Sequence, residues 1–93
     1  MSGRRVLKYR VDWDGQEIAL PVGSVPRHFN VQDRLPTVWI EVPGEWVSTT
    51  IVTKRTFRVF GTGHEIPDGS VYVGTCMDRE FVWHLYEVTD VHP

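Results

Sequence analysis

The stretch YRVDWDGQEI at residues 9–18 lies without a gap over FRVFGTGHEI at residues 57–66, and this correspondence decides the fold. Arg, Val, Gly, Glu and Ile coincide between the two stretches, and Tyr is matched by Phe. When two residues are omitted, PVGSV at 21–25 lies over PDGSV at 67–71. Each half closes on a strand pattern with Val-Trp and Glu-Val, at 37–42 and 81–88. Three matches in the same order indicate an internal repeat.

Strand patterns dominate both halves, and helical periodicity is almost absent. The expected strands are 6–11, 24–31, 37–42, 46–52 (continuing into 57–60 as one long or bent strand), 70–75 and 81–86. Gly15 and Gly63 occupy one position of the repeat, which predicts a backbone conformation that disfavours a side chain. A three-stranded unit exposes one apolar face, and two units can bury these faces against each other. The sequence predicts an all-β fold, a small sandwich or barrel of six to seven mostly antiparallel strands built from two pseudo-twofold repeats.

The overall composition is that of one small globular domain spanning residues 1–93. We place repeat 1 at about 4–42, a linker or extra strand at 43–53, and repeat 2 at about 54–88. The net charge of −2 argues against a non-specific nucleic-acid binder. A single cysteine cannot form an internal disulfide, no apolar run has the length of a membrane helix, and no apolar signal core follows the N-terminus. We therefore expect a cytoplasmic protein.

Tryptophan is frequent for so short a chain, with Trp13, Trp39, Trp46 and Trp83. A core of this size cannot easily enclose all four, so at least one is expected on a contact surface. The positions at which the two halves differ are the best candidates for binding. These are Trp13, which is aligned with Gly61, His64, which is aligned with Gln16, and Trp46 in the unmatched middle segment.

Two histidines stand in patterns that could carry chemistry. His64 follows Gly-Thr-Gly, which suggests a phosphate loop, but the full spacing and the following helix are missing, so a strand-connecting loop is favoured. In the strand 81–86, alternation puts Val82, His84 and Tyr86 on one face, and Phe81, Trp83 and Leu85 on the other. The pair is either a surface patch or a proton-transfer site. A histidine satisfied by its neighbours is favoured, because no nucleophile or carboxylate is evidently placed beside it.

Other reactive residues lack a recognisable setting. Cys76 has no evident activating base, and a small strand-end residue is the simpler interpretation. Asp12 and Asp14 match only part of a calcium loop, so a turn is favoured. His28 and His92 add no metal-ligand spacing, and metal binding by His64 with His84 requires the fold to bring them together. We predict no catalytic residues, no metal and no cofactor.

Basic residues cluster in corresponding strands of the two halves. They are Arg4, Arg5, Lys8 and Arg10 in the first half and Lys54, Arg55 and Arg58 in the second. If the halves pair symmetrically, these side chains could form one basic face suited to a single-stranded nucleic acid or a nucleotide. Alternatively, lysine and arginine protect edge strands from sheet addition. The net charge favours the second interpretation and makes a nucleic-acid partner the less favoured one.

The segment VFGTGHEIPDG at 59–69, together with YVGT at 72–75 and FVWHLYE at 81–87, resembles a family of small uncharacterised proteins encoded by actinobacteriophages, mycobacteriophages among them. That family is a domain of unknown function, so the resemblance implies an origin and no reaction. This chain departs from the family pattern in a longer middle segment, 43–53, which carries Trp46.

Small phage proteins of this kind commonly act by binding a host protein. The resemblance therefore implies a non-enzymatic protein of the host cytoplasm that modulates a host process, in host takeover or superinfection exclusion. A coiled-coil scaffold of polar growth is one specific candidate partner. The alternative is a nucleotide- or nucleic-acid-binding module that counters host defence. Exposed strand edges also make a homodimer an open expectation.

Overall fold

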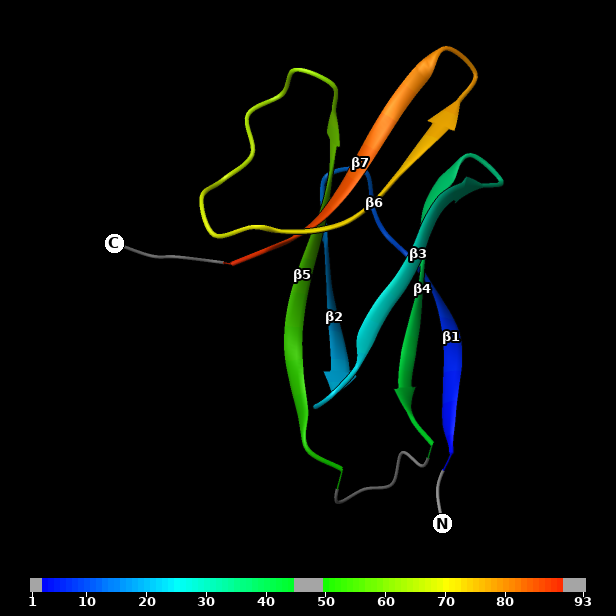
Figure 1. Ribbon diagram of the computed structural model, residues 1–93, viewed down its shortest axis with the longest axis vertical. Helices are drawn as coiled ribbons and strands as arrows, with labels where there is room; N and C mark the ends of the chain where they lie inside the picture. Colours follow the sequence, from blue (N-terminus) through cyan, green and yellow to red (C-terminus); the bar gives the residue numbers. More distant parts are fainter. Residues whose placement is uncertain (1–2, 45–49, 90–93) are drawn as a thin grey trace.

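The computed structural model describes residues 3–44 and 50–89, and all its regular elements are strands (Figure 1). They are β1 (Arg4–Arg10), β2 (Gln16–Pro21), β3 (Val25–Gln32), β4 (Leu35–Pro43), β5 (Val52–Gly61), β6 (Val71–Asp78) and β7 (Phe81–Val88). The predicted all-β class is confirmed. Within the described residues, no helix is long and apolar enough to cross a membrane.

The strands form two sheets, with the orders β1-β4-β3 and β2-β5-β7-β6, and every neighbouring pair is antiparallel. The sheets stay separate, so the chain adopts the sandwich and not the closed barrel. Their facing sides supply one core, whose largest fully buried side chains are Phe29, Phe57, Leu20, Ile40 and Leu85. Both halves contribute to this core, which explains why a three-strand unit needs its mate.

The internal repeat is visible in the strand order. In the first half the order β1-β4-β3 places the last strand in the middle, and β5-β7-β6 repeats this arrangement in the second half. The turns repeat as well. Ser24 donates backbone and hydroxyl hydrogen bonds to the carbonyl of Pro21, and Ser70 does the same with Pro67. The backbone φ angles of Gly15 and Gly63 are +115° and +91°, as their shared position predicts.

Strand β2 breaks the repeat, and the sequence patterns missed it as a strand. It leaves the first half and pairs with β5 of the second, from Gln16 opposite Phe57 to Pro21 opposite Val52. Its burial alternates, with Ile18 and Leu20 inside. Ala19 and Leu20 are the two residues that the repeat alignment omits. The second half lacks their counterparts, so the segment 62–70 is too short to form a matching strand and is a loop.

The edge strands β3 and β6 approach each other across the sandwich at Gly74. A β-carbon on Gly74 would lie 3.2 Å from the β-carbon of Phe29, which is almost fully buried. A bulge between Tyr72 and Gly74 accompanies this contact. A glycine at this position therefore lets β6 pack closely against Phe29 of β3.

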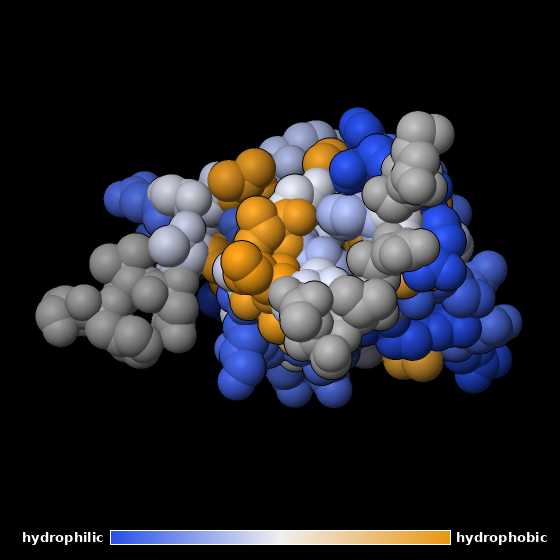
Figure 2. All heavy atoms as spheres, turned by 90° about the horizontal axis from the view of Figure 1, so that it is seen from below, coloured by the Kyte–Doolittle hydropathy of each residue, from blue (hydrophilic) through white to orange (hydrophobic). Residues whose placement is uncertain are grey.

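The structure describes only the two ends of the middle segment, residues 43–44 and 50–53. Residues 45–49, which include Trp46, lie outside the described residues, and β5 begins at Val52. Exposed apolar side chains gather where β2 ends and β5 begins (Figure 2). There the amide of Val22 donates a 3.0 Å hydrogen bond to the carbonyl of Ile51.

Candidate functional site

An aromatic cluster of Trp13, Phe81 and Trp83 is partly open to solvent. The ring centroids of Trp13 and Trp83 are 5.0 Å apart in an edge-on arrangement, and those of Phe81 and Trp83 are 5.7 Å apart and stacked. Phe81 is 53% exposed and Trp13 37%. The β1–β2 loop thus places Trp13, a predicted contact residue, against the start of β7.

The aromatic cleft, about 480 Å³ in volume, opens beside this cluster. It is lined by Gly61, Thr62, His64, Glu80, Phe81, Val82 and Trp83. Gly61 is paired in register with Trp83, and a β-carbon on it would lie 3.4 Å from the indole. The same β-carbon would lie 3.1 Å from the imidazole of His64, so glycine at this position, where the first half has Trp13, lets the His64 ring lie close to the backbone.

His64 lies at the rim of the aromatic cleft, held by its own loop. Its Nδ1 accepts a 3.1 Å hydrogen bond from the amide of Gly61. A neutral imidazole that accepts at Nδ1 carries its proton on Nε2. This Nε2–H has no acceptor among the described residues, so it is an available donor at the rim.

The indole N–H of Trp83 is shielded from solvent and has no hydrogen-bond partner within residues 3–44 and 50–89. A buried donor in this state costs on the order of 1–3 kcal/mol. Such groups are uncommon in folded proteins. The unsatisfied donor thus belongs to a residue that lines the aromatic cleft, although the N–H itself is shielded from solvent, and the pattern of strand alternation could not reveal it.

His84 lies on the outer face of β7 with both ring nitrogens hydrogen-bonded. Its Nε2 and Nδ1 are each 3.0 Å from a hydroxyl, that of Thr62 and that of Thr75. The Thr75 hydroxyl is in turn 2.7 Å from the phenol oxygen of Tyr72. The structure thus supports the interpretation of a histidine satisfied by its neighbours.

Tyr86 shares a face of β7 with His84, as alternation predicted, and this is the outer face. Its ring contacts Phe60 and Tyr72, with centroid distances of 5.8 and 5.4 Å. These contacts form an aromatic ladder across three neighbouring strands. Tyr86 is therefore part of the packing of the outer face and lies outside the lining of the aromatic cleft.

The remaining candidates have structural settings. Burial raises the pKa of the Cys76 thiol, the opposite of what an activated nucleophile requires. The carboxylate of Asp12 accepts a 3.0 Å hydrogen bond from the amide of Asp14, which makes the predicted turn. In the described parts of the chain, no three His, Cys, Asp or Glu side chains gather as metal ligands.

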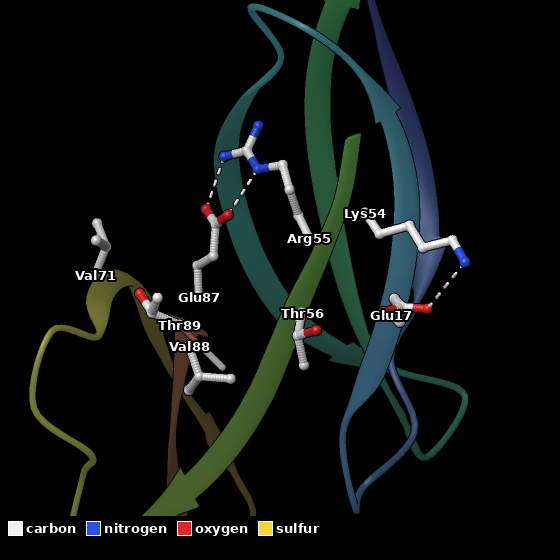
Figure 3. Close-up of a pocket in the computed structure, with 8 residues that line it drawn as sticks. All are labelled: Glu17, Lys54, Arg55, Thr56, Val71, Glu87, Val88 and Thr89. Atoms are coloured by element: carbon white, nitrogen blue, oxygen red, sulfur yellow. Dashed lines mark hydrogen bonds and ion pairs between the residues drawn. The ribbon is translucent and has the colours of Figure 1, made fainter. Parts of the chain in front are cut away.

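The charged cleft, about 350 Å³ in volume, lies between β5 and the end of β7 (Figure 3). There Arg55 donates two 2.7 Å hydrogen bonds to the carboxylate of Glu87 and a third, also 2.7 Å, to the carbonyl of Ser24. The carboxylate of Glu87 raises the pKa of the guanidinium. Lys54 faces Glu17 at 4.0 Å. Each cation is matched by a carboxylate, so the charged cleft offers no surplus charge to an ionic ligand.

One basic face shared by the two halves, the less favoured of the two interpretations, is contradicted by the strand pairing. Arg4, Lys8 and Arg10 lie on the outer face of the three-stranded sheet. Lys54 and Arg58 lie on the outer face of the other sheet, and Arg55 points inward. The repeat halves pack face to face, and this places the outer sides of β1 and β5 on opposite sides of the sandwich.

The comparisons with known proteins identify a family and no activity. The chain belongs to the family described as Domain of unknown function (DUF7352), whose model matches residues 2–93. No curated protein and no solved structure matches it.

Proposed function

We propose that this family member is a non-enzymatic binding module that takes a side chain of a protein partner into the aromatic cleft. The observation that carries the proposal is the cluster of three aromatic rings, in which the exposed Phe81 and Trp13 both pack against the partly buried Trp83. Aromatic residues in a concave surface are where protein interfaces concentrate their binding energy. His64 adds a hydrogen-bond donor at the rim of the same cleft.

The lining of the aromatic cleft favours a protein side chain over a nucleotide. Its charged lining residue is the carboxylate of Glu80, and no lysine or arginine lines it. A phosphate would be repelled by Glu80 and would find no cation, whereas an apolar side chain would cover the indole of Trp83. If the alternative of nucleotide or nucleic-acid binding is right, the ligand should therefore bind outside the aromatic cleft.

A host protein is the partner class that the resemblance to actinobacteriophage proteins implies. We carry it forward as part of the proposal, with host takeover or superinfection exclusion as the process and a coiled-coil growth scaffold as one candidate. The phage origin rests on the sequence resemblance. The host cytoplasm remains the corresponding expectation for location.

The test is capture from a mycobacterial lysate by four proteins: the wild type, Phe81→Ala, Trp13→Ala and Ile51→Ala. Ile51 is an exposed apolar residue that does not line the aromatic cleft, so Ile51→Ala is the matched control. We expect one partner to be retained by the wild type and the control and lost by Phe81→Ala, which changes the lining of the cleft, and by Trp13→Ala, which removes the ring beside it. With that partner purified, these two variants should bind at least about tenfold more weakly.

Photocrosslinking makes the test independent of folding defects. A benzophenone amino acid at position 81 should crosslink to the same partner, and one at position 51 should not. A partner captured equally by all four proteins, or no specific partner at all, would refute the proposal.

A further inference from the structure

Strand β1 has an open edge. In residues 3–44 and 50–89 it pairs with β4 and with no other strand. The amide of Val11 donates a 2.9 Å hydrogen bond to the carbonyl of Pro36, which sets the phase of the ladder. Along an antiparallel pair, every second residue directs its N–H and C=O groups toward the partner strand. The N–H and C=O groups of Arg4, Val6, Lys8 and Arg10 therefore point in the plane of the sheet, away from β4. This edge is a template for an added strand.

The repeat shows that such a position is filled elsewhere in the same fold. β5, the counterpart of β1, is flanked on one side by β7 and on the other by β2. Strand β2 covers β5 from Val52 to Phe57, and the repeat alignment matches these residues to Arg4 through Tyr9 of β1. The segment 62–70 forms a loop and adds no strand to β1. One of two equivalent edges is therefore covered and the other is open.

The charge of the three-stranded sheet, with four of its cations in β1, favours an acidic occupant for this edge. The spans 4–10 and 25–43 carry six of the ten Lys and Arg residues and only two of the twelve Asp and Glu residues. Lys8 is hydrogen-bonded to the neutral Gln32 and has no carboxylate partner within the described residues. Arg4 pairs with the partly buried Glu41, and Arg10 pairs with the exposed Asp33. Both guanidinium groups are themselves exposed, so they can also meet a carboxylate of a partner.

We propose that the edge of β1 accepts an extended acidic segment of a partner protein by strand addition. Backbone hydrogen bonds would come from the outward groups of Val6 and Lys8, and acidic side chains at alternate positions would face Lys8 and Arg10. A second copy fits poorly, because antiparallel pairing of two β1 strands sets cations opposite cations. This surface is separate from the aromatic cleft, and the inference stands without that proposal.

The probe is a fluorescent seven-residue peptide that alternates glutamate with valine or threonine, with a lysine version as charge control. Binding is followed by anisotropy for the wild type, Val6→Pro and Val6→Ala. Val6 is 54% exposed, so replacing its side chain removes little packing. Proline at this position removes an N–H that points away from β4 and leaves the hydrogen bonds between β1 and β4 intact. We expect the acidic peptide alone to bind, with at least about tenfold loss in Val6→Pro and less than about twofold in Val6→Ala. Lys8→Glu should also weaken binding.

Three outcomes would overturn the proposal. One is equal binding by Val6→Pro and Val6→Ala. Another is tighter binding of a twelve-nucleotide oligothymidine that Trp39→Ala abolishes, because Trp39 lies beside Lys8 and 5.4 Å from His28 and would stack bases. The third is that the free protein forms a dimer and that Val6→Pro converts this dimer to monomers. If Val6→Pro fails to fold, slowed amide exchange of Val6 and Lys8 in the peptide-bound wild type supports the proposal, and unchanged exchange refutes it.

Discussion

Replacing Arg55 by methionine should destabilise the protein strongly, although Arg55 lies away from both proposed binding surfaces. Its side chain is 22% exposed and that of Glu87 23%, so water reaches the pair only in part. The guanidinium donates three hydrogen bonds of 2.7 Å that tie β5 to the end of β7 and to the turn before β3. Methionine has a similar length and no donor, so the variant leaves the Glu87 carboxylate and the Ser24 carbonyl without this partner.

The size of the effect follows from the burial of the pair. Breaking a fully buried pair costs roughly 3–5 kcal/mol, and the remaining exposure of both side chains reduces this to about 2–3 kcal/mol. A 93-residue domain is stable by about 5–14 kcal/mol. The melting temperature of Arg55→Met should therefore fall by roughly 10–20 °C.

The assay is denaturant unfolding followed by tryptophan fluorescence. Lys54→Met is the matched control, because Lys54 is exposed and its ion pair with Glu17 has a separation of 4.0 Å, so its loss should cost less than about 0.5 kcal/mol. The double variant Arg55→Met/Glu87→Leu should recover at least half of the loss, since it removes the unpaired carboxylate. If Arg55→Met were as stable as Lys54→Met, the ion pair would not be the clamp that we infer.

Three further predictions follow from single contacts. Gly74→Ala should lower stability by about 1–2 kcal/mol, because the new methyl group presses on Phe29, and a stability equal to the wild type in urea unfolding would contradict the close approach. Glu41 has its pKa lowered from 4.5 by hydrogen bonds from Arg27 and then Arg4. Its stabilising effect is therefore complete above its unfolded pKa and is lost as the pH falls through the lower folded value. Glu41→Gln should flatten the decline of melting temperature between about pH 5 and 3, and an unchanged decline would argue against the pairing. The pKa of the Cys76 thiol is raised by burial, so it should react with a disulfide reagent at pH 8 more slowly than free cysteine, and an equal rate would show that the thiol is open.

The local sequence was sufficient for the features that depend on neighbouring residues. Alternation placed His84 and Tyr86 on one face of β7, and the repeat predicted a backbone conformation at Gly15 and Gly63 that disfavours a side chain, which the structure shows as positive φ. The turn at Asp12 was also predicted, because the short side chain of an aspartate can accept a hydrogen bond from the backbone amide two residues later. Periodicity and turn preferences depend on a few neighbouring residues, so these features can be predicted from the sequence without knowledge of the tertiary structure.

Features that join distant segments were decided only by the tertiary structure. Strand β2 was missed because Ala19 and Leu20 have no counterpart in the repeat, although buried Ile18 and Leu20 alternate as in any half-buried strand. Its pairing with β5 then turned Arg55 inward, so a cation assigned to a surface became part of an internal clamp.

The candidate site shows the same division. The sequence by itself identified Trp13 and His64 as positions where the halves differ, and Trp46 lies outside the described residues. Only the packed sandwich put Trp13 against Trp83 and opened a cleft beside Phe81. The physical reason is that a strand pattern specifies which side chains share a face. The sheet that a strand joins, and the face that it meets, are chosen by burial of the whole core.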